Sequence, residues 1–336
     1  MSKFDQEIRT KWTEAMINGY FKYQLTSLQT RIIPGRRGYI AQLNPLRFTE
    51  RRKPQDIQNI NQKFDPNKFN FTKISKQEIL LHPVGSHWSA SKPVTPSSKS
   101  LSDVLKHDEN MIIINVSPLE FGHCLIIPQV NQSFPQAITT FGLTLSLECL
   151  LLSKHPGFRV GFNSLCALAS VNHQHYHCYY FDQQLPVEKC NTFKLSNSIY
   201  ELIDWPVRGF VFQLDGQTIS SFVKTIKTIT KFFQEAEIAH NLLMSRGSVL
   251  GTCIGNCKNT VCAYLWPRRK FKGAKEFEHV NVALVEMGGQ LPVKDKDSYE
   301  RMSQSEIDEI LESVTFTHEE FEDLKKKILG LLCKEK

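Results

Sequence analysis

Apolar and polar residues follow two periods along this chain, one typical of helices and one of strands. Apolar residues recur at helical intervals over residues 5–29, 134–154 and 220–240, and each range is predicted to be a helix. Shorter apolar runs rich in β-branched and aromatic residues predict strands. These runs fall in residues 38–45, in two hairpin-like runs within 111–128, in 158–163 and 170–180, and in 241–247, 261–267 and 280–293. Two further helices are expected at the C-terminus.

The order of these elements predicts an α+β fold in which antiparallel sheet packs against helices. Strands, a helix and more strands follow one another twice, so two related halves are expected within one body. We assign residues 1–30 to an N-terminal helical segment, 31–195 to the first half and 196–336 to the second half. Polar, basic residues over 49–74 predict a surface excursion. Ser, Pro and Lys crowd into residues 86–102, which predicts an exposed, mobile loop.

The composition excludes some classes of protein. The 336 residues are 41% hydrophobic, which is enough for a sizeable core, and the formal net charge is +7. Basic runs at 51–53 and 268–270 have the short length typical of solvated faces, and no nucleic-acid-binding motif accompanies them. A positive balance suits an anionic small-molecule substrate. Nucleic acid is therefore not an expected partner, and no pattern predicts an oligomeric state.

No stretch of the sequence is apolar for the ~18 residues that a transmembrane helix needs. The longest candidate, residues 143–152, contains Thr144, Ser146 and Glu148. The N-terminal residues alternate charged and apolar side chains and lack the apolar core of a secretory signal. No membrane partner is expected, and the sequence predicts a cytoplasmic location.

Nine cysteines lack the spacing of a disulfide framework, so reduced thiols are expected. Cys253, Cys257 and Cys262 lie close together in the sequence, and thiolates are good zinc ligands. Their spacing is not the paired C-x-x-C of zinc ribbons, and no fourth ligand lies nearby. The sequence favours free thiols over a metal site there.

The segment SVNHQHYHCYY, residues 170–180, has a histidine at every second position. Side chains alternate between the faces of a strand, so His173, His175 and His177 are predicted to share one face. Three interpretations are open: structural histidines satisfied by their neighbours, a metal site, and phosphoryl or nucleotidyl transfer through a histidine. For a lone histidine the structural interpretation is favoured, but three on a single face weaken it.

A metal site can use only two of these histidines unless the strand bends sharply. Alternate residues of a strand lie about 6.5 Å apart and the outer two about 13 Å, whereas zinc–nitrogen bonds are about 2 Å long. No Asp or Glu lies within four residues on the same face. Transfer through a histidine uses all three, because a neutral imidazole attacks phosphorus while its neighbours bind phosphate oxygens and assist the leaving group. A metal-binding protein that uses two of the histidines is the alternative from another class.

The segment SVNHQHYH resembles the His-x-His-x-His signature of the histidine-triad superfamily, including the serine three positions before the first histidine. GHCLIIP is similar to a strand that lies earlier in those sequences. Longer blocks resemble the GDP-D-glucose phosphorylases, relatives of the plant GDP-L-galactose phosphorylases. They include GYIAQLNP, FDPNKFNFTKI, INVSPLEFGHCLIIP and NVALVEMGGQLPVK, in order between about residues 38 and 294. The resemblance implies a histidine-triad-like fold.

The resemblance also implies a nucleotidyltransferase reaction. His175, the middle histidine, would attack the α-phosphorus of GDP-D-glucose and release glucose 1-phosphate. Inorganic phosphate would then displace the guanylyl-histidine and release GDP. In the family, residues at the positions of His173, His177 and Ser170 contact phosphate or orient the nucleophile, and Asn163 falls near a family asparagine on the phosphate side. No metal cofactor is required, although the scheme leaves room for a bound Mg²⁺.

Further candidates come from residue type and from departures from the family. Arg159 and Arg246 lie next to predicted strands and are candidate phosphate ligands, as are the arginines of residues 36–52. The phenylalanines of FDPNKFNF are candidates for the guanine face or for the core. Gln290 stands where the family has histidine, and glutamine can still donate and accept hydrogen bonds. A hydrolase or phosphorylase of a dinucleoside polyphosphate or of another GDP-hexose is the alternative within the same chemistry.

Overall fold

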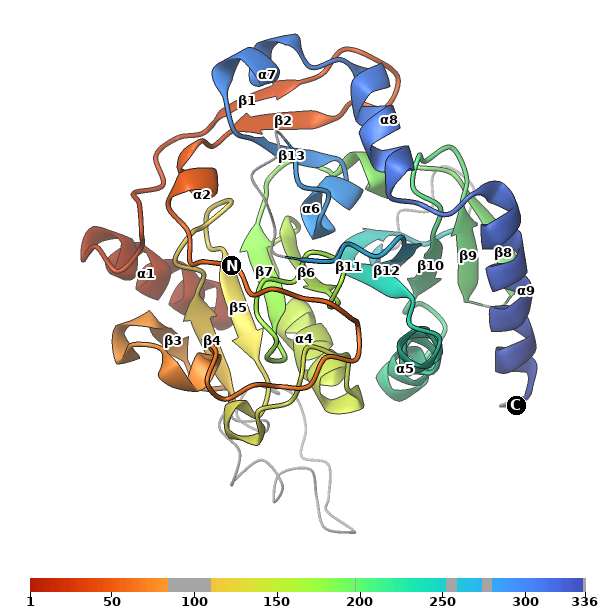
Figure 1. The fold of residues 1–336 in the computed structure, drawn as a ribbon, viewed down its shortest axis with the longest axis horizontal. Helices are drawn as coiled ribbons and strands as arrows, with labels where there is room; N and C mark the ends of the chain where they lie inside the picture. The colour runs from red at the N-terminus through yellow and green to blue at the C-terminus, as the bar shows by residue number, and fades with distance from the viewer. Residues whose placement is uncertain (84–109, 197, 252–258, 274–279, 335–336) are drawn as a thin grey trace.

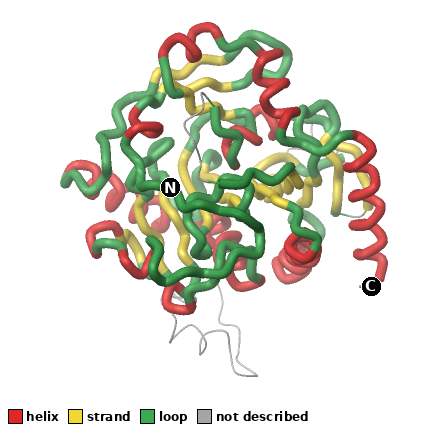
Figure 2. Tube along the Cα trace, in the orientation of Figure 1, coloured by secondary structure: helices red, strands yellow, loops and turns green. Residues whose placement is uncertain are grey.

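One long antiparallel sheet runs through the middle of the chain (Figures 1 and 2). The computed structural model describes residues 1–83, 110–196, 198–251, 259–273 and 280–334. Within these residues, ten strands form the sheet, and each pairs antiparallel with its neighbours. In spatial order they are Ile79–Leu81 (β3), Met111–Ile114 (β4), Cys124–Ile127 (β5), Tyr176–Tyr180 (β7), Phe158–Asn163 (β6), Ala239–Ser248 (β11), Asn259–Arg268 (β12), Phe210–Gln213 (β10), Ile199–Leu202 (β9) and Thr192–Ser196 (β8).

The sheet contains two copies of one unit. Each unit has three strands, a helix and two strands: β3, β4, β5, α4 (Thr140–Leu152), β6 and β7, and then β8, β9, β10, α5 (Ile219–Glu235), β11 and β12. The units join where β6 pairs with β11, and the strand order outward from this junction is the same on both sides. The predicted α+β class with antiparallel sheet is confirmed. The domain boundaries that we assigned stay a prediction.

The two units differ in the side chains that β7 and β12 present on the face of the sheet away from α4 and α5. β7 carries His177 there, whereas the matching face of β12 carries Cys262, Tyr264 and Trp266, all buried in a core of their own. Within the described residues of β12 no second triad exists. Among the described strands, the histidine site therefore belongs to the first unit.

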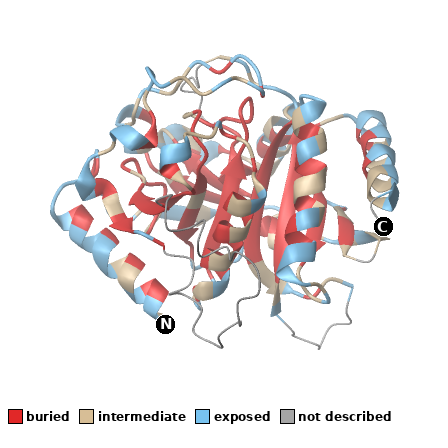
Figure 3. Ribbon diagram, turned by 90° about the horizontal axis from the view of Figure 1, so that it is seen from below, coloured by how far each residue is buried: buried red, intermediate tan, exposed pale blue. Residues whose placement is uncertain are grey.

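Helices cover one face of the sheet and a smaller sheet covers the other. The first face packs against α1 (Lys3–Ile17), α4, α5 and α9 (His318–Lys334), whose apolar residues join those of the strands in one core. The second face packs against β2 (Ile40–Leu43) and β13 (Gln290–Val293), and against α7 (Lys296–Arg301) and α8 (Gln304–Ser313). The mostly exposed strand β1 (Gln29–Ile32) pairs with β2 at the outside of the smaller sheet. Figure 3 shows the buried strands between these layers and the exposed outer sides of the helices. Short helices complete the chain: α2 (Leu46–Thr49), α6 (Leu284–Met287) and the 3-10 turns Phe71–Lys73, Lys76–Glu78, Val130–Gln132 and Pro186–Lys189.

Several predicted elements differ from those observed. The helix predicted over 5–29 ends at Ile17, because the chain turns at Asn18 and Gly19 adopts a left-handed φ of 73°. The helix predicted over 134–154 begins at Thr140, where the Thr139 hydroxyl caps it by accepting from the Gly142 N–H. The strand predicted over 280–293 is wrong in its first part, which forms α6, and strands β8 to β10 were not predicted. The predicted loop at 86–102 lies outside the described residues.

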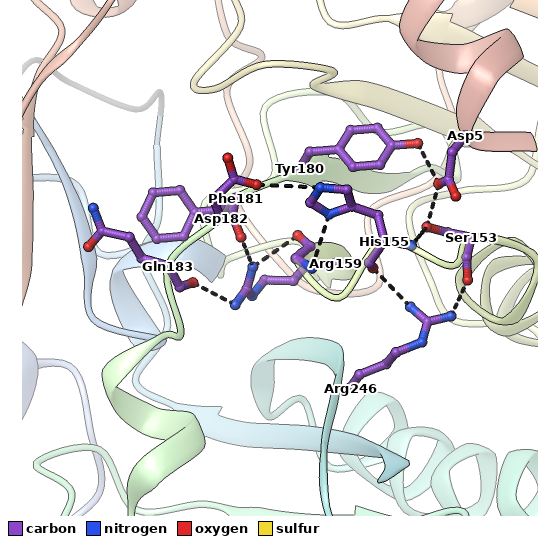
Figure 4. Close-up of polar contacts among 10 residues, drawn as sticks. Asp5, Ser153, His155, Arg159, Tyr180, Phe181, Asp182, Gln183 and Arg246 are labelled. Carbon is purple, nitrogen blue, oxygen red and sulfur yellow. Dashed lines mark hydrogen bonds and ion pairs between the residues drawn. The ribbon is translucent and has the colours of Figure 1, made fainter. Parts of the chain in front are cut away.

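Asp5 fastens α1 to the first unit of the sheet (Figure 4). Its carboxylate is fully buried and accepts hydrogen bonds from the Ser153 hydroxyl (2.5 Å), the Lys154 backbone N–H (2.9 Å) and the Tyr180 hydroxyl (3.0 Å). Burial by itself raises the pKa of Asp5, but hydrogen bonds from Ser153, Lys154 and Ser2 outweigh it and hold the pKa below its usual value. Asp5 is therefore charged in the folded chain at neutral pH.

We expect Asp5→Ala to lower the free energy of unfolding at pH 7 by about 2–3 kcal/mol, because buried donors lose a charged acceptor. A depressed pKa stabilises the fold above the unfolded-state value of about 3.9, and this stabilisation is lost as the pH falls through the folded-state pKa. The gap between the variant and the parent should therefore narrow in acid. Urea unfolding between pH 3 and 7 measures it, with the exposed Asp297→Ala as the matched control. An equal gap at every pH would contradict this role.

Candidate active site

The three histidines lie around the start of β7 and not along its length. Only His177 belongs to the strand, which begins at Tyr176, so the prediction of one strand carrying all three is wrong in extent. The ladder between β5 and β7 ends at the pair Ile126 and Tyr176. The alternation of side chains between the two faces nevertheless continues before the strand begins. Gln174 and Tyr176 both point toward the α4 side, where Gln174 donates a hydrogen bond to Thr139.

A side chain replaces the missing strand partner at His175. Gln136, fully buried in the loop before α4, accepts from the His175 N–H through Oε1 (2.8 Å). Its Nε2 donates to the carbonyl of His175 (3.0 Å) and to that of Asn163 (2.9 Å). One amide thus ties the residue before β7 to the end of β6. The sequence analysis missed Gln136, since no periodicity or motif marks a side chain that bonds only to backbone.

His175 is held in one tautomer. Its Nδ1 lies 2.8 Å from the carbonyl oxygen of His173, and a carbonyl only accepts, so Nδ1 carries the proton. Nε2 keeps its lone pair, and His175 lines a pocket. Burial lowers the pKa of His175 to about 4, against a small opposing effect of the bond to His173. The ring is therefore neutral at pH 7, which is the form that attacks phosphorus.

His173 supports the site from behind. Its ring is fully buried between Phe64 and Phe71, and its Nδ1 accepts from the Phe71 N–H (3.1 Å). Burial lowers the pKa of His173 to about 4. The ring does not line the pocket, so its link to the site is the backbone carbonyl that fixes His175.

A fourth histidine sets the tautomer of His177. His123 accepts at Nδ1 from the Leu119 N–H (3.0 Å), so in its neutral form the proton is on Nε2. That nitrogen lies 3.0 Å from Nδ1 of His177 and donates to it, which leaves the proton of a neutral His177 on Nε2. Burial, together with the nearby His177 and Arg47, holds the pKa of His123 well below its usual value. His123 lies in the GHCLIIP block, but the sequence analysis gave it no role.

Asn163 and Ser170 line the same pocket as His175 and His177, and their contact with phosphate stays a prediction. The side-chain oxygen of Asn163 accepts from Asn241 (2.6 Å) and from the Leu284 N–H (3.0 Å), so its amide nitrogen is left to face the histidines. That nitrogen lies 3.4 Å from Nε2 of His177. Two N–H groups therefore stand side by side at one wall of the pocket, an arrangement suited to an anionic oxygen.

Arg159 and Arg246 do not line this pocket, and we withdraw both as phosphate ligands (Figure 4). Arg159 is buried and pairs with Glu188 (2.9 Å), and it also donates to the carbonyls of Gly157, Phe181 and Gln183. Arg246 donates to the carbonyls of Leu150, Ser153 and His155 where α4 ends. A cation is favourable at a helix C-terminus, and both arginines satisfy backbone carbonyls.

Other arginines line the pocket instead. Arg47 lies in α2 and Arg51 lies just after it, and both line the pocket. Arg47 donates to the Ser117 carbonyl (2.5 Å). Arg52 also lines the pocket but is held by both oxygens of Glu78 (2.7 and 2.6 Å). Of the predicted phenylalanines, Phe71 is buried against His173 and His175, and Phe69 is half-buried at the pocket wall beneath Arg52. Glu286 of α6 also lines the pocket.

Other sequence expectations concern metals and membranes. Among the described residues, no group of three or more His, Cys, Asp or Glu side chains is arranged to hold a metal ion. Cys262 is a buried free thiol, whereas Cys253 and Cys257 lie outside the described residues. No helix in the described part of the chain is long and apolar enough to cross a membrane.

Comparison with known proteins identifies the family. A model described as "GDPGP1-like, N-terminal domain" matches residues 3–179, and one described as "GDPGP1-like, C-terminal domain" matches residues 181–335. The chain belongs to the GDPGP1-like family. The two models meet at the end of β7, so each covers one of the two units of the sheet.

Curated relatives of this GDPGP1-like chain match it along nearly its whole length. GDP-D-glucose phosphorylase 1 of Danio rerio is 41% identical over 338 residues, which cover 98% of this chain and 92% of the relative. The protein of the same name from Homo sapiens is 37% identical and covers 99% and 85%. GDP-L-galactose phosphorylase 2 of Arabidopsis thaliana is 31% identical and covers 96% and 75%. The resemblance stated from the sequence is confirmed, and the chain is an enzyme of the nucleotidyltransferase type.

A solved structure shares the fold. Yeast Ap4A phosphorylase Apa2 in complex with AMP aligns with a TM-score of 0.61 over 94% of this chain and 98% of that chain, at 16% identity. At this identity the likeness concerns the fold alone. The histidine-triad-like architecture implied by the sequence is confirmed.

This chain has Gln290 at a position where the resemblance to the family predicts a histidine. It is fully buried at the start of β13, where its Nε2 donates to Oε1 of Gln42 (2.6 Å) on the parallel neighbour β2. Gln42 in turn donates to Glu120 (2.7 Å). Gln290 is not among the residues that line the pocket. Any effect of Gln290 on the reaction is therefore indirect.

We expect Gln290→His to change the turnover rate by less than about tenfold, which is under 1.4 kcal/mol of transition-state stabilisation. Imidazole can still donate to Gln42, and the pocket wall is unchanged. Steady-state kinetics of the two proteins measure the effect. A much larger gain in rate would show that glutamine weakens this member of the GDPGP1-like family.

Proposed function

We propose that this chain catalyses the phosphorolysis of GDP-D-glucose to GDP and glucose 1-phosphate through a guanylyl group carried by His175. The observation that carries the proposal is the state of His175, a neutral ring with Nδ1 occupied and Nε2 available at the pocket wall. Relatives named GDP-D-glucose phosphorylase match nearly the whole chain, which supports this substrate. Inorganic phosphate is then the second substrate.

In the first step, Nε2 of His175 attacks the α-phosphorus of GDP-D-glucose. A bond forms between nitrogen and phosphorus, and the bond from that phosphorus to the bridging oxygen breaks. The electron pair leaves with the oxygen, so glucose 1-phosphate departs as an anion without needing a proton. The carbonyl of His173 stabilises the positive charge that develops on the ring, because it already accepts from Nδ1.

In the second step, an oxygen of inorganic phosphate attacks the same phosphorus and the bond to nitrogen breaks. The electron pair returns to Nε2, and GDP is released with the former phosphate as its β-phosphate. Negative charge builds on the α-phosphate oxygens in both steps. The N–H groups of His177 and Asn163, adjacent in the pocket, are placed to stabilise that charge. Ser170 lies in the same wall and adds a hydroxyl donor.

Purified protein incubated with GDP-D-glucose, with and without inorganic phosphate, tests the proposal when the products are separated by chromatography. We expect GDP and glucose 1-phosphate in equal amounts, formed only with phosphate. GDP-L-galactose run in parallel tests the other GDP-hexose suggested by the plant relative, and diadenosine tetraphosphate tests the dinucleoside alternative. GMP formed at the same rate with or without phosphate would identify a hydrolase and contradict the proposal. The cytoplasmic location stays a prediction.

A further inference from the structure

Two arginines line the same pocket as His175 and His177, and we call Arg47 and Arg51 the arginine wall. Arg47 lies in the only turn of the short helix α2, and Arg51 follows just after the helix ends; both side chains line the pocket. The backbone of the turn is fixed from both ends. Asn44 accepts from the Arg47 N–H (3.3 Å), and the Glu50 N–H bonds the Leu46 carbonyl (2.7 Å).

Arg47 of the arginine wall differs from Arg52 in its hydrogen-bond partners. The Arg52 guanidinium is neutralised by both oxygens of Glu78 and lies over the Phe69 ring, 4.5 Å from its centroid. Among the described residues, no ion pair joins Arg47 to a carboxylate; its Nη1 donates to the uncharged carbonyl of Ser117. Burial and the charge of Arg47 lower the pKa of Arg51. Two like charges thus face one pocket, and an anion between them would relieve their repulsion.

The histidines lie within reach of this charge. Arg47 is one of the groups that lower the pKa of His123, which bonds His177. The arginine wall, His175 and His177 all line the same pocket. The pocket therefore has two places for anionic oxygens, one at the N–H groups of His177 and Asn163 and one at the arginine wall. Guanidinium groups suit phosphate because their planar fork donates two parallel hydrogen bonds.

The chemistry requires a second phosphate position, and only one. The leaving phosphate of the first step and the entering phosphate of the second both stand opposite Nε2 of His175, in line with the α-phosphorus. The same subsite must therefore hold the β-phosphate of the nucleotide sugar and, later, inorganic phosphate. Resting on the proposed function, we propose that Arg47 and Arg51 form this subsite and make phosphate, in place of water, the acceptor of the guanylyl group.

The proposal predicts a change of acceptor when the arginine wall is weakened. A guanylyl-enzyme that cannot hold phosphate keeps its reactive N–P bond, and water attacks the α-phosphorus instead, giving GMP and a proton. Loss of a charge-assisted contact costs enough to raise the KM for inorganic phosphate by about 10- to 100-fold. The share of GMP among the guanine nucleotide products should rise with it. Cleavage of GDP-D-glucose should slow as well, because the β-phosphate uses the same groups.

We would measure the KM for inorganic phosphate and the GMP to GDP ratio in full-length Arg47→Met and Arg51→Met. Arg36→Met is the matched control, because Arg36 is exposed and does not line the pocket. Arg47→Lys keeps the charge and loses the fork, so it should fall between the parent and Arg47→Met. It also replaces Arg47→Met if thermal unfolding shows that this variant does not fold.

Each outcome separates this proposal from the proposed function. A raised KM for phosphate with more GMP in the wall variants, and neither change in Arg36→Met, supports the subsite. An unchanged KM and product ratio in both folded wall variants overturns it, while the parent enzyme still forms GDP from phosphate. If the parent itself forms no GDP from GDP-D-glucose and phosphate, the proposed function fails instead, and the subsite for this acceptor fails with it.

Discussion

His175→Ala is expected to reduce GDP-D-glucose phosphorolysis by at least ~10⁴-fold, because no other group can accept the guanylyl group from its position. The pocket wall keeps His177, Asn163 and the arginines, so some affinity for the nucleotide sugar should persist. Steady-state assays with isothermal titration of GDP-D-glucose separate the two effects. The exposed His318→Ala is the matched control and should retain the parent rate.

Near-normal turnover in folded His175→Ala would end the assignment of the nucleophile. A loss of binding as large as the loss of rate would instead give His175 a role in substrate affinity. The low pKa of His175, about 4, predicts how the rate depends on pH. The neutral, attacking form of the ring predominates at neutral pH, so the rate should fall only as the pH approaches 4 and the ring is protonated.

Gln136→Leu is expected to lower kcat by about 100-fold, the size of effect that follows a small misplacement of a reacting group. The substitution leaves the His175 N–H and the carbonyls of His175 and Asn163 without their partner. Unsatisfied buried groups cost about 1–3 kcal/mol each, so thermal stability should fall too. The KM for phosphate should change little, since Gln136 does not line the pocket.

Two comparisons separate positioning from simple destabilisation. Gln136→Glu keeps the acceptor for the His175 N–H but loses both donors, so its kcat should lie between those of the parent and Gln136→Leu. Gln132→Leu, at an exposed position in the 3-10 turn just before the loop of Gln136, should keep the parent kcat and stability. A folded Gln136→Leu with parent kcat would show that Gln136 only stabilises the chain.

The sequence analysis located the proposed nucleophile His175 and its neighbour His177, which line the pocket, but not the groups that orient them. Alternation predicted that His173, His175 and His177 face one way, and this holds although β7 starts only at Tyr176. It could not reveal that His173 acts through its carbonyl, because that depends on the chain leaving the ladder. Gln136 and His123 were missed for a related reason, since both act through hydrogen bonds that form only in the folded chain.

Arginines were the weakest part of the sequence analysis. A position next to a predicted strand does not say which groups will surround a long side chain. Arg246 bonds carbonyls at the end of α4, on the helix-covered side of the sheet, and Arg159 is enclosed by the turn after β7. Arg47 and Arg51 reach the pocket because α2 packs over it, a tertiary contact without a periodic signal. The first part of the strand predicted over 280–293 was wrong for a similar reason, since an apolar run fits a buried helix as well as a strand.

The measurement that tests the account most directly is to trap the covalent intermediate. The enzyme is mixed with GDP-D-glucose without phosphate, quenched within one turnover at alkaline pH and analysed by intact mass and peptide mapping. We predict a gain of one guanylyl group on His175, one equivalent of glucose 1-phosphate released, and conversion of the adduct to GDP when phosphate is added. Phosphorolysis that proceeds at the normal rate with no adduct, or with the adduct on another residue, would contradict the account.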